Sequence, residues 1–283
     1  MKMRTKKESI YMKISDFKIG RHGKYCFRGN WDEKIFKKSI AIVGSRRMTR
    51  YGKDAVDRFV SEIVANGITT ISGFMYGVDT EVHQKTVDYG GLTIAVLGCG
   101  LDVVYPPENE KLYIQILETD GLIISEYEPS AKPHLWKFPQ RNKIVAGLST
   151  LGVLVIEAGE KSGSLITAGL AEKMGKNVFA VPGPINSSTS TGTNELIKNG
   201  RAKLVTTATD IIGGKSLIDN KKSDIKLVGI EGEIFRLLEN EPLDADEIAI
   251  QINKNVVEVG TTLSVMGIKG FVIESGGKFY LQK

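Results

Sequence analysis

A phosphate-binding turn is the first chemistry that this sequence suggests. Residues 40–43 form a short apolar run, and Gly44, Ser45, Arg46 and Arg47 follow it directly. A run of this kind, ended by a glycine and followed by a helical pattern, is typical of a buried parallel strand that leads into a helix. The unpaired N–H groups at the start of a helix attract anions, and the two guanidinium groups add positive charge. We therefore expect these four residues to bind phosphate.

A second turn of the same design lies at residues 161–164, where Lys161, Ser162, Gly163 and Ser164 begin another predicted helix. Small or flexible residues end five predicted strands in all, at 44–46, 72–73 (Ser72 and Gly73), 98–100, 159–164 and 182–183. Any one of these segments is equally consistent with an ordinary tight turn. Because ligands of parallel sheets bind beyond the carboxyl ends of the strands, the five together favour a ligand site.

A third segment combines aromatic rings with cations. It contains Trp136, Lys137 and Phe138, followed by Arg141, Asn142 and Lys143. Rings stack on bases and cations follow phosphates, which is the combination that binds single-stranded nucleic acid. A surface loop anchored by aromatic residues and followed by a solvated helix would have the same residues. The segment therefore supports nucleic-acid binding only in combination with the predicted anion sites.

Several cofactor and enzyme classes lack their motifs here. The chain has no G-x-G-x-x-G after its first predicted strand, no G-x-x-x-x-G-K-[ST] and no G-x-S-x-G. Its two cysteines and three histidines have no metal-ligand spacing (Cys26, Cys99, His22, His83 and His134). We therefore expect no cofactor and no metal. Glu157 and Glu195 are candidates for acid and base, although a hydrogen-bonding carboxylate and a solvated helix position explain them as well.

Strands and helices alternate strictly through the middle of the chain, with connections too long for hairpins. Predicted strands cover residues 40–43, 68–72, 93–97, 122–125, 152–156 and 177–181, and predicted helices cover 49–66, 78–89, 108–118, 140–148 and 164–174. This order predicts an α/β fold with a doubly wound, Rossmann-like parallel sheet.

The ends of the chain differ from this middle part. We predict an N-terminal lead-in at residues 1–35, a Rossmann-like domain at 36–212, a polar linker at 213–224 and a small winged-helix domain at 225–283, with helices 230–238, 244–252 and 256–268 before a hairpin at 271–281. The third of these helices contains Glu258 and no Lys or Arg. Since helices that read duplex DNA carry cations and base-edge donors, we expect this domain to contact protein.

Charge is divided unevenly between these parts. The chain has a net charge of +5; residues 225–283 carry six Lys or Arg and nine Asp or Glu, so the rest carries the remaining 32 and 24, a net +8. A polyanionic partner is therefore expected on the larger domain. No apolar stretch resembles a secretory signal or a membrane span, which predicts a cytoplasmic protein without membrane contact.

Taken together, short motifs in a fixed order resemble the DprA/Smf family, DNA-processing protein A. They run from about residue 35 to 212: Gly44-Ser45-Arg46, Ser72-Gly73, Gly77-Val78-Asp79 with His83, Phe138-Pro139 with Arg141-Asn142-Lys143, Ala146-Gly147-Leu148-Ser149, Glu157-Ala158, Lys161-Ser162-Gly163-Ser164, Thr167-Ala168, Val181-Pro182-Gly183 and Gly192-Thr193-Asn194. The resemblance implies a homodimeric, non-enzymatic protein that binds and protects single-stranded DNA and helps to load a RecA-type recombinase during natural transformation.

The resemblance also implies roles for individual residues. Arg46 would hold a backbone phosphate, Lys137, Arg141 and Lys143 would extend the basic pocket, and Phe138 would be a stacking ring. Residues 161–164 would offer N–H and hydroxyl donors. Two departures stand out: residues 74–76 are Phe-Met-Tyr where the family usually has smaller residues, and the helical domain that many members carry ahead of the sheet is expected to be absent.

Two other functions remain open at this point. The sheet also resembles that of nucleotide-monophosphate phosphoribohydrolases, in which Glu157 or Glu195 would act on a single bound nucleotide. A transcriptional regulator that uses the winged helix, with the sheet as ligand sensor, is the third alternative, and the acidic domain and a third helix without Lys or Arg argue against it.

Overall fold

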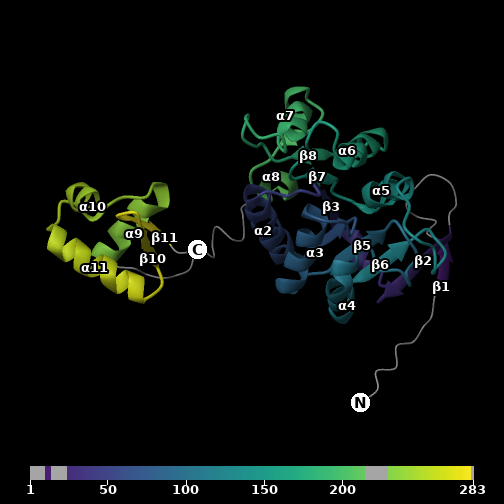
Figure 1. The fold of residues 1–283 in the computed structure, drawn as a ribbon, viewed down its shortest axis with the longest axis horizontal. Coiled ribbons are helices and arrows are strands. Elements are labelled where there is room, and N and C mark those ends of the chain that lie inside the picture. The colour runs from purple at the N-terminus through teal and green to yellow at the C-terminus, as the bar shows by residue number, and fades with distance from the viewer. Residues whose placement is uncertain (1–9, 14–23, 214–228, 282–283) are drawn as a thin grey trace, which may run out of the picture. The chain divides into compact units, whose positions relative to one another are not determined.

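The computed structural model describes residues 10–13, 24–213 and 229–281 of the chain. The chain divides into two compact units, residues 1–219 and residues 220–283. The larger unit contains the sheet, and the smaller one contains three helices and a hairpin (Figure 1). Of the predicted linker, only Gly213 lies among the described residues.

Among the described residues, the larger unit is built on one nine-stranded sheet. Seven neighbouring strands of this sheet are parallel, and the two strands at one edge are antiparallel. Across the sheet the strands are β1 (Ile10–Lys13), β2 (Lys24–Gly29), β6 (Leu122–Ser125), β5 (Thr93–Leu97), β4 (Thr69–Ser72), β3 (Ser39–Val43), β7 (Val153–Val155), β8 (Val178–Ala180) and β9 (Lys203–Leu204). From β3 the chain builds the sheet outward through β4, β5 and β6, and then returns to the other side of β3 with β7. The strand order therefore reverses between β3 and β7, as expected for a doubly wound fold.

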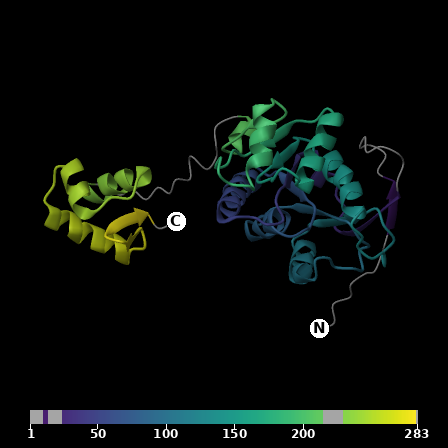
Figure 2. The same ribbon diagram turned by 45° about the horizontal axis from the view of Figure 1, so that its top comes forward.

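Helices cover both faces of this sheet (Figures 1 and 2). All five residues of β3 are buried, with Ile40 and Ile42 packed on one face and Ala41 and Val43 on the other. One face carries α2 (Arg50–Ala65), α3 (Val78–Asp88), α4 (Glu110–Glu118) and α8 (Thr209–Ile212), and the other carries α1 (Lys34–Lys37), α5 (Lys137–Leu148), α6 (Gly163–Lys173) and α7 (Thr191–Lys198). Burial on both faces explains why the central strands are apolar runs without alternation.

The N-terminal segment contributes strands that the sequence analysis did not predict. β2 pairs antiparallel with β6, placing Cys26 opposite Ser125, and β1 pairs antiparallel with β2. Tyr25, Cys26 and Phe27 are buried in the core. The signal was weak because β2 has cations in its sequence and because its pairing partner lies almost a hundred residues away. The segment is therefore part of the sheet and does not merely lie on it.

The smaller unit has the element order predicted for a winged helix. Helices α9 (Ile230–Asn240), α10 (Ala245–Gln251) and α11 (Val256–Ile268) precede a hairpin of β10 (Val272–Ser275) and β11 (Lys278–Leu281). Asp244 is the N-cap of α10 and forms a capping box with Glu247. The hairpin turn needs Gly276 and Gly277, whose φ values of 62° and 78° are unfavourable for other residues.

Two features of the described residues bear on the functional classes above. None of the helices is long and apolar enough to cross a bilayer. Both cysteines are buried, and burial raises the pKa of the Cys99 thiol to about 11. Both therefore behave as small core residues and not as reactive thiols.

Candidate nucleic-acid interface

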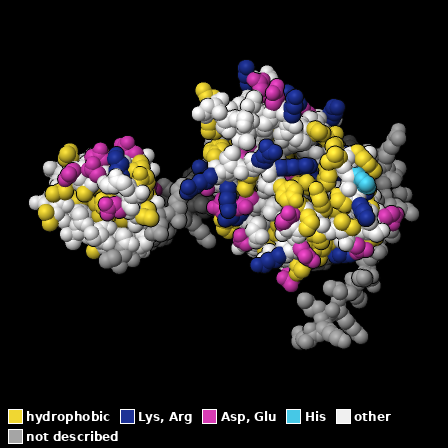
Figure 3. All heavy atoms as spheres, in the orientation of Figure 1, with side chains coloured by type: hydrophobic (Ala, Val, Ile, Leu, Met, Phe, Trp, Pro, Cys, Tyr) yellow, Lys and Arg dark blue, Asp and Glu magenta, His cyan; other side chains and the backbone are white. Residues whose placement is uncertain are grey.

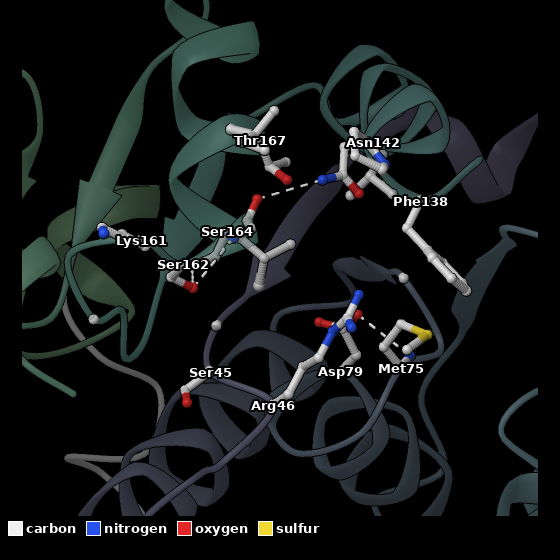
Figure 4. Close-up of a pocket in the computed structure, with 18 of the residues that line it drawn as sticks. Ser45, Arg46, Met75, Asp79, Phe138, Asn142, Lys161, Ser162, Ser164 and Thr167 are labelled. Atoms are coloured by element: carbon white, nitrogen blue, oxygen red, sulfur yellow. Dashed lines mark hydrogen bonds between the residues drawn. The ribbon is translucent and has the colours of Figure 1, made fainter. Parts of the chain in front are cut away.

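A cavity of about 590 Å³ lies at the carboxyl ends of β3 and β7, where the strand order reverses. Its walls come from segments that are far apart in sequence: residues 43–47 after β3, the segment around Gly73 and Asp79, the start of α5, and residues 159–167 at the start of α6 (Figure 4). Residues 188 and 189 complete the lining. The reversal of strand order is where doubly wound sheets bind their ligands.

The first wall is the turn after β3. Gly44 packs so closely on Val78 that a Cβ at this position would overlap it. The Arg47 backbone N–H donates to the Ser45 hydroxyl at 3.0 Å, which fixes the turn. Both arginine side chains are exposed at the cavity, and the Arg46 guanidinium carbon lies 5.4 Å from the centroid of the Phe138 ring. The turn thus presents two solvent-exposed cations to a bound anion.

The second wall is the N-terminus of α6. Ser162 is its N-cap and accepts a hydrogen bond from the Ser164 backbone N–H at 3.4 Å, while the two hydroxyls lie 2.7 Å apart. Lys161 is exposed and lines the cavity with them, and a Cβ added to Gly163 would meet open space. The positive end of the helix dipole and an exposed lysine therefore lie on the same wall of the cavity.

The floor of the cavity holds a buried pair of opposite charges. Arg141 and Asp79 lie on either side of Gly73, so closely that a Cβ on Gly73 would overlap both side chains. Arg141 is only 2% exposed and donates to the Val96 carbonyl oxygen, and Asp79 accepts from the Met75 N–H at 3.3 Å. Burial raises the pKa of Asp79, an effect that the Arg141 charge opposes. The Arg141 and Asp79 side chains therefore lie close together in the buried floor of the cavity.

Glu157 connects two of the loops around the cavity through hydrogen bonds. Its Oε1 accepts hydrogen bonds from the Thr49 hydroxyl at 2.6 Å and from the Thr189 hydroxyl at 3.1 Å, and its Oε2 accepts from the Thr49 N–H at 2.9 Å. Thr49 is the N-cap of α2, which follows the arginine turn, and Thr189 lines the cavity. The carboxylate is 1% exposed and does not line the cavity. It therefore positions two loops from outside the cavity.

The surface view agrees with this arrangement. Figure 3 shows Lys and Arg side chains along α2 and over the region of β3 and β7, with hydrophobic side chains beside them. Cations next to apolar surface suit a ligand that carries phosphates on one side and rings on the other.

Comparison with known proteins identifies the family. The profile of the family described as DNA recombination-mediator protein A matches residues 25–214, which is most of the larger unit. The chain belongs to this family. The DprA/Smf resemblance of the short motifs is thereby confirmed, and the match includes β2.

Curated relatives and solved structures agree with this assignment. The DNA processing protein DprA of Streptococcus pneumoniae is 42% identical over 186 residues, which cover 66% of this chain and 64% of that protein. Protein Smf of Escherichia coli is 34% identical over 253 residues, covering 85% of this chain and 67% of its own length. The structure of DNA processing protein A from Helicobacter pylori, described as having a unique single-stranded DNA binding mode, superposes with a TM-score of 0.63 at 34% identity and covers 71% of this chain and 94% of that one. The chain thus spans about two thirds of the length of the first two relatives.

The structure brings most of the predicted site residues of this DprA-family chain into one cavity. Its lining includes Gly44, Ser45, Arg46, Arg47, Gly73, Phe138, Arg141, Asn142, Lys161, Ser162, Gly163 and Ser164. Of the five predicted strand-end segments, 98–100 and 182–183 do not line it. Three of the five predicted strand-end segments therefore contribute to the cavity.

Three predicted contacts lie outside the cavity. Ser72 is fully buried and donates to the Ile42 carbonyl oxygen at 2.7 Å, so it stabilises the sheet. Lys137 is 6% exposed; its Nζ donates to the Lys132 carbonyl oxygen at 2.7 Å and lies 4.6 Å from the centroid of the Tyr127 ring. Lys143 is half-buried and does not line the cavity. Helix α5 turns the side chains of Lys137 and Lys143 away from the cavity, and Ser72 lies within β4, so these three residues do not line it.

The role of Phe138 as a stacking ring stays a prediction. The ring does line the cavity, but the residue is only 7% exposed, and Arg46 and Tyr105 lie against it. Residues that sequence reasoning missed include Asp79, Leu135, Ile166, Thr167, Ser188 and Thr189. Asp79 and Thr167 belong to family motifs that the sequence showed, whereas nothing in the local pattern singled out Leu135 or Ile166.

Proposed function

We propose that this protein binds single-stranded DNA in the cavity between β3 and β7, with little preference for sequence. The observation that carries the proposal is the convergence of three exposed cations, Arg46, Arg47 and Lys161, with the N-terminus of α6 on one concave site. A cavity can enclose a base only when that base is unpaired, which favours a single strand over a duplex. The single-stranded DNA binding described for the H. pylori relative supports the same ligand.

The proposal extends to the biological role of the family. We infer a recombination mediator that protects incoming single-stranded DNA and helps to load a RecA-type recombinase during natural transformation, acting as a homodimer. The family description and the names of the relatives support DNA processing in recombination. The protein would act by binding and not by catalysis.

The alternative of a nucleotide phosphoribohydrolase finds little support in the geometry. Glu157 is occupied by three hydrogen bonds beneath the loops, and Glu195 is bonded to Lys198 and Asn199 on an exposed turn of α7. Neither carboxylate lines the cavity. A bound nucleotide would therefore meet no acid or base from this pair.

The smaller unit is proposed to contact protein. The exposed part of α11 presents Val257, which is 72% exposed, together with Val256 and Val265, and the helix has no Lys or Arg. A truncated chain that ends before residue 225 should therefore bind DNA as the full chain does. Loss of duplex binding on that truncation would assign a DNA contact to the smaller unit.

A fluorescence-anisotropy titration tests the central proposal. The full chain should bind a labelled single strand more tightly than a duplex of the same length, and Arg46→Glu should weaken this binding at least tenfold. Lys111→Glu is the matched control, because Lys111 is exposed on α4 and does not line the cavity. Equal loss in both variants, or no binding of either DNA form, would refute the proposal. Release of free base from nucleotide monophosphates would favour the enzyme.

A further inference from the structure

Two exposed aliphatic side chains line the cavity beside its cations. Leu135 directly precedes the N-cap of α5 and is 85% exposed, and Ile166 lies in the first turns of α6 and is 46% exposed. Single exposed apolar residues are common and need no special explanation. These two differ because they line the same concave site, which also holds three exposed cations.

Phe138 is poorly placed to provide the apolar contact that single strands need. Its ring is covered by the Arg46 guanidinium at 5.4 Å and by the Tyr105 ring at 5.8 Å between centroids. Gly98 packs on it so tightly that a Cβ there would approach the Phe138 ring to 2.6 Å. A base could stack on this ring only by displacing Arg46, which is itself one of the phosphate-binding cations.

We propose, on the basis of the proposed function, that Leu135 and Ile166 hold a nucleobase of the bound strand by apolar contact while Arg46, Arg47 and Lys161 hold its phosphates. A nucleotide carries its charge at one end and a flat, largely apolar ring at the other, so it matches a site with cations and aliphatic side chains. Burial of the ring against these side chains removes apolar surface from water.

This assignment also accounts for tolerance of sequence. Aliphatic side chains have no donor or acceptor, so they cannot read the hydrogen-bonding edges of a base, whereas all four bases present an apolar face. The base-dependent part of the affinity therefore belongs to Leu135 and Ile166, and the salt-dependent part belongs to the cations.

The test compares two oligonucleotides with the full chain. One is a dT strand, and the other is an abasic strand of the same length, which keeps the phosphates and lacks the bases. Wild type should bind the dT strand about tenfold more tightly, within the range measured for base contacts. The double variant Leu135→Ser/Ile166→Ser should lose most of this preference while its affinity for the abasic strand stays unchanged. Leu92→Ser, at a position 40% exposed and away from the cavity, is the matched control.

Three results would overturn the inference. If the double variant keeps the preference, these side chains do not contact the base. If Trp136→Ser removes the preference instead, the base stacks on this neighbouring ring, which is 56% exposed. If wild type binds both strands equally, the site holds phosphates alone and the proposed function stands without a base contact. Binding of neither strand by wild type would instead refute the proposed function itself.

Discussion

The salt dependence of binding provides a quantitative test of which cations face the DNA. Six Lys or Arg residues were candidates from sequence, but only Arg46, Arg47 and Lys161 are both exposed and part of the cavity lining. Each phosphate contact to a single strand lowers log affinity by about 0.7 per unit of log salt. Three contacts give a slope of about −2.1, whereas six would give about −4.2.

These slopes correspond to clearly different losses of affinity. Between about 50 and 200 mM salt, a slope of −2.1 weakens binding by about 18-fold, and a slope of −4.2 weakens it by more than about 300-fold. The variant Arg46→Ala should reduce the slope to about −1.4, so that the same change in salt weakens binding by only about 7-fold. Fluorescence anisotropy with a labelled single strand at several salt concentrations measures all of these values.

Lys143→Ala is the appropriate control, because Lys143 is half-buried outside the cavity. Its slope should equal that of wild type. A wild-type slope near −4, or an equal change of slope in the Lys143 and Arg46 variants, would show that side chains we place outside the cavity contact phosphate. The site as we describe it would then be refuted.

Three further predictions concern groups around the cavity. Burial lowers the pKa of His83 from 6.5 to about 3, so at acidic pH the unfolded chain binds a proton that the folded chain does not. The free energy of unfolding should therefore fall as the pH drops below 6.5, by about 2 kcal/mol at pH 5. Denaturant titrations at both pH values should give a smaller loss for His83→Asn. Gly73→Ala should lower the free energy of unfolding by about 1–3 kcal/mol and weaken DNA binding, because its Cβ would overlap Arg141 and Asp79; unchanged stability would contradict this packing. Glu157→Gln should lower the free energy of unfolding by about 1.5–3 kcal/mol, because an amide accepts hydrogen bonds through one oxygen and the carboxylate accepts through both. Anisotropy should show that the folded variant binds DNA more weakly. Full DNA affinity would mean that Glu157 does not position the loops.

Sequence patterns were sufficient for the central fold. Most of the buried parallel strands are apolar runs, helices such as α2 have a 3.6-residue repeat, and glycines mark many of the turns that follow. These signals are local, so β3 to β8 and α2 to α6 were expected within a few residues of their observed bounds. By contrast, β2 is held by pairing with β6, where Cys26 lies opposite Ser125. Such contacts between distant residues have no local pattern.

The sequence alone located the two turns that we propose bind phosphate. A strand that ends in Gly44 and continues as Ser45-Arg46-Arg47, and a helix that begins at residues 162–164, expose N–H groups and cations through backbone geometry that the local residue types impose. It also determined the family, because the motifs recur in a fixed order.

The direction of each side chain depended on tertiary structure. Lys137, Arg141 and Lys143 occupy neighbouring positions of α5, yet one is held by a loop carbonyl, one is buried beside Asp79 and one lies outside the cavity. Leu135 and Ile166 became candidates only when the packing of α5 and α6 placed both at the cavity. A helix turns about 100° per residue, so its contact with the sheet selects which of its side chains reach the ligand, and that contact is formed by residues distant in sequence.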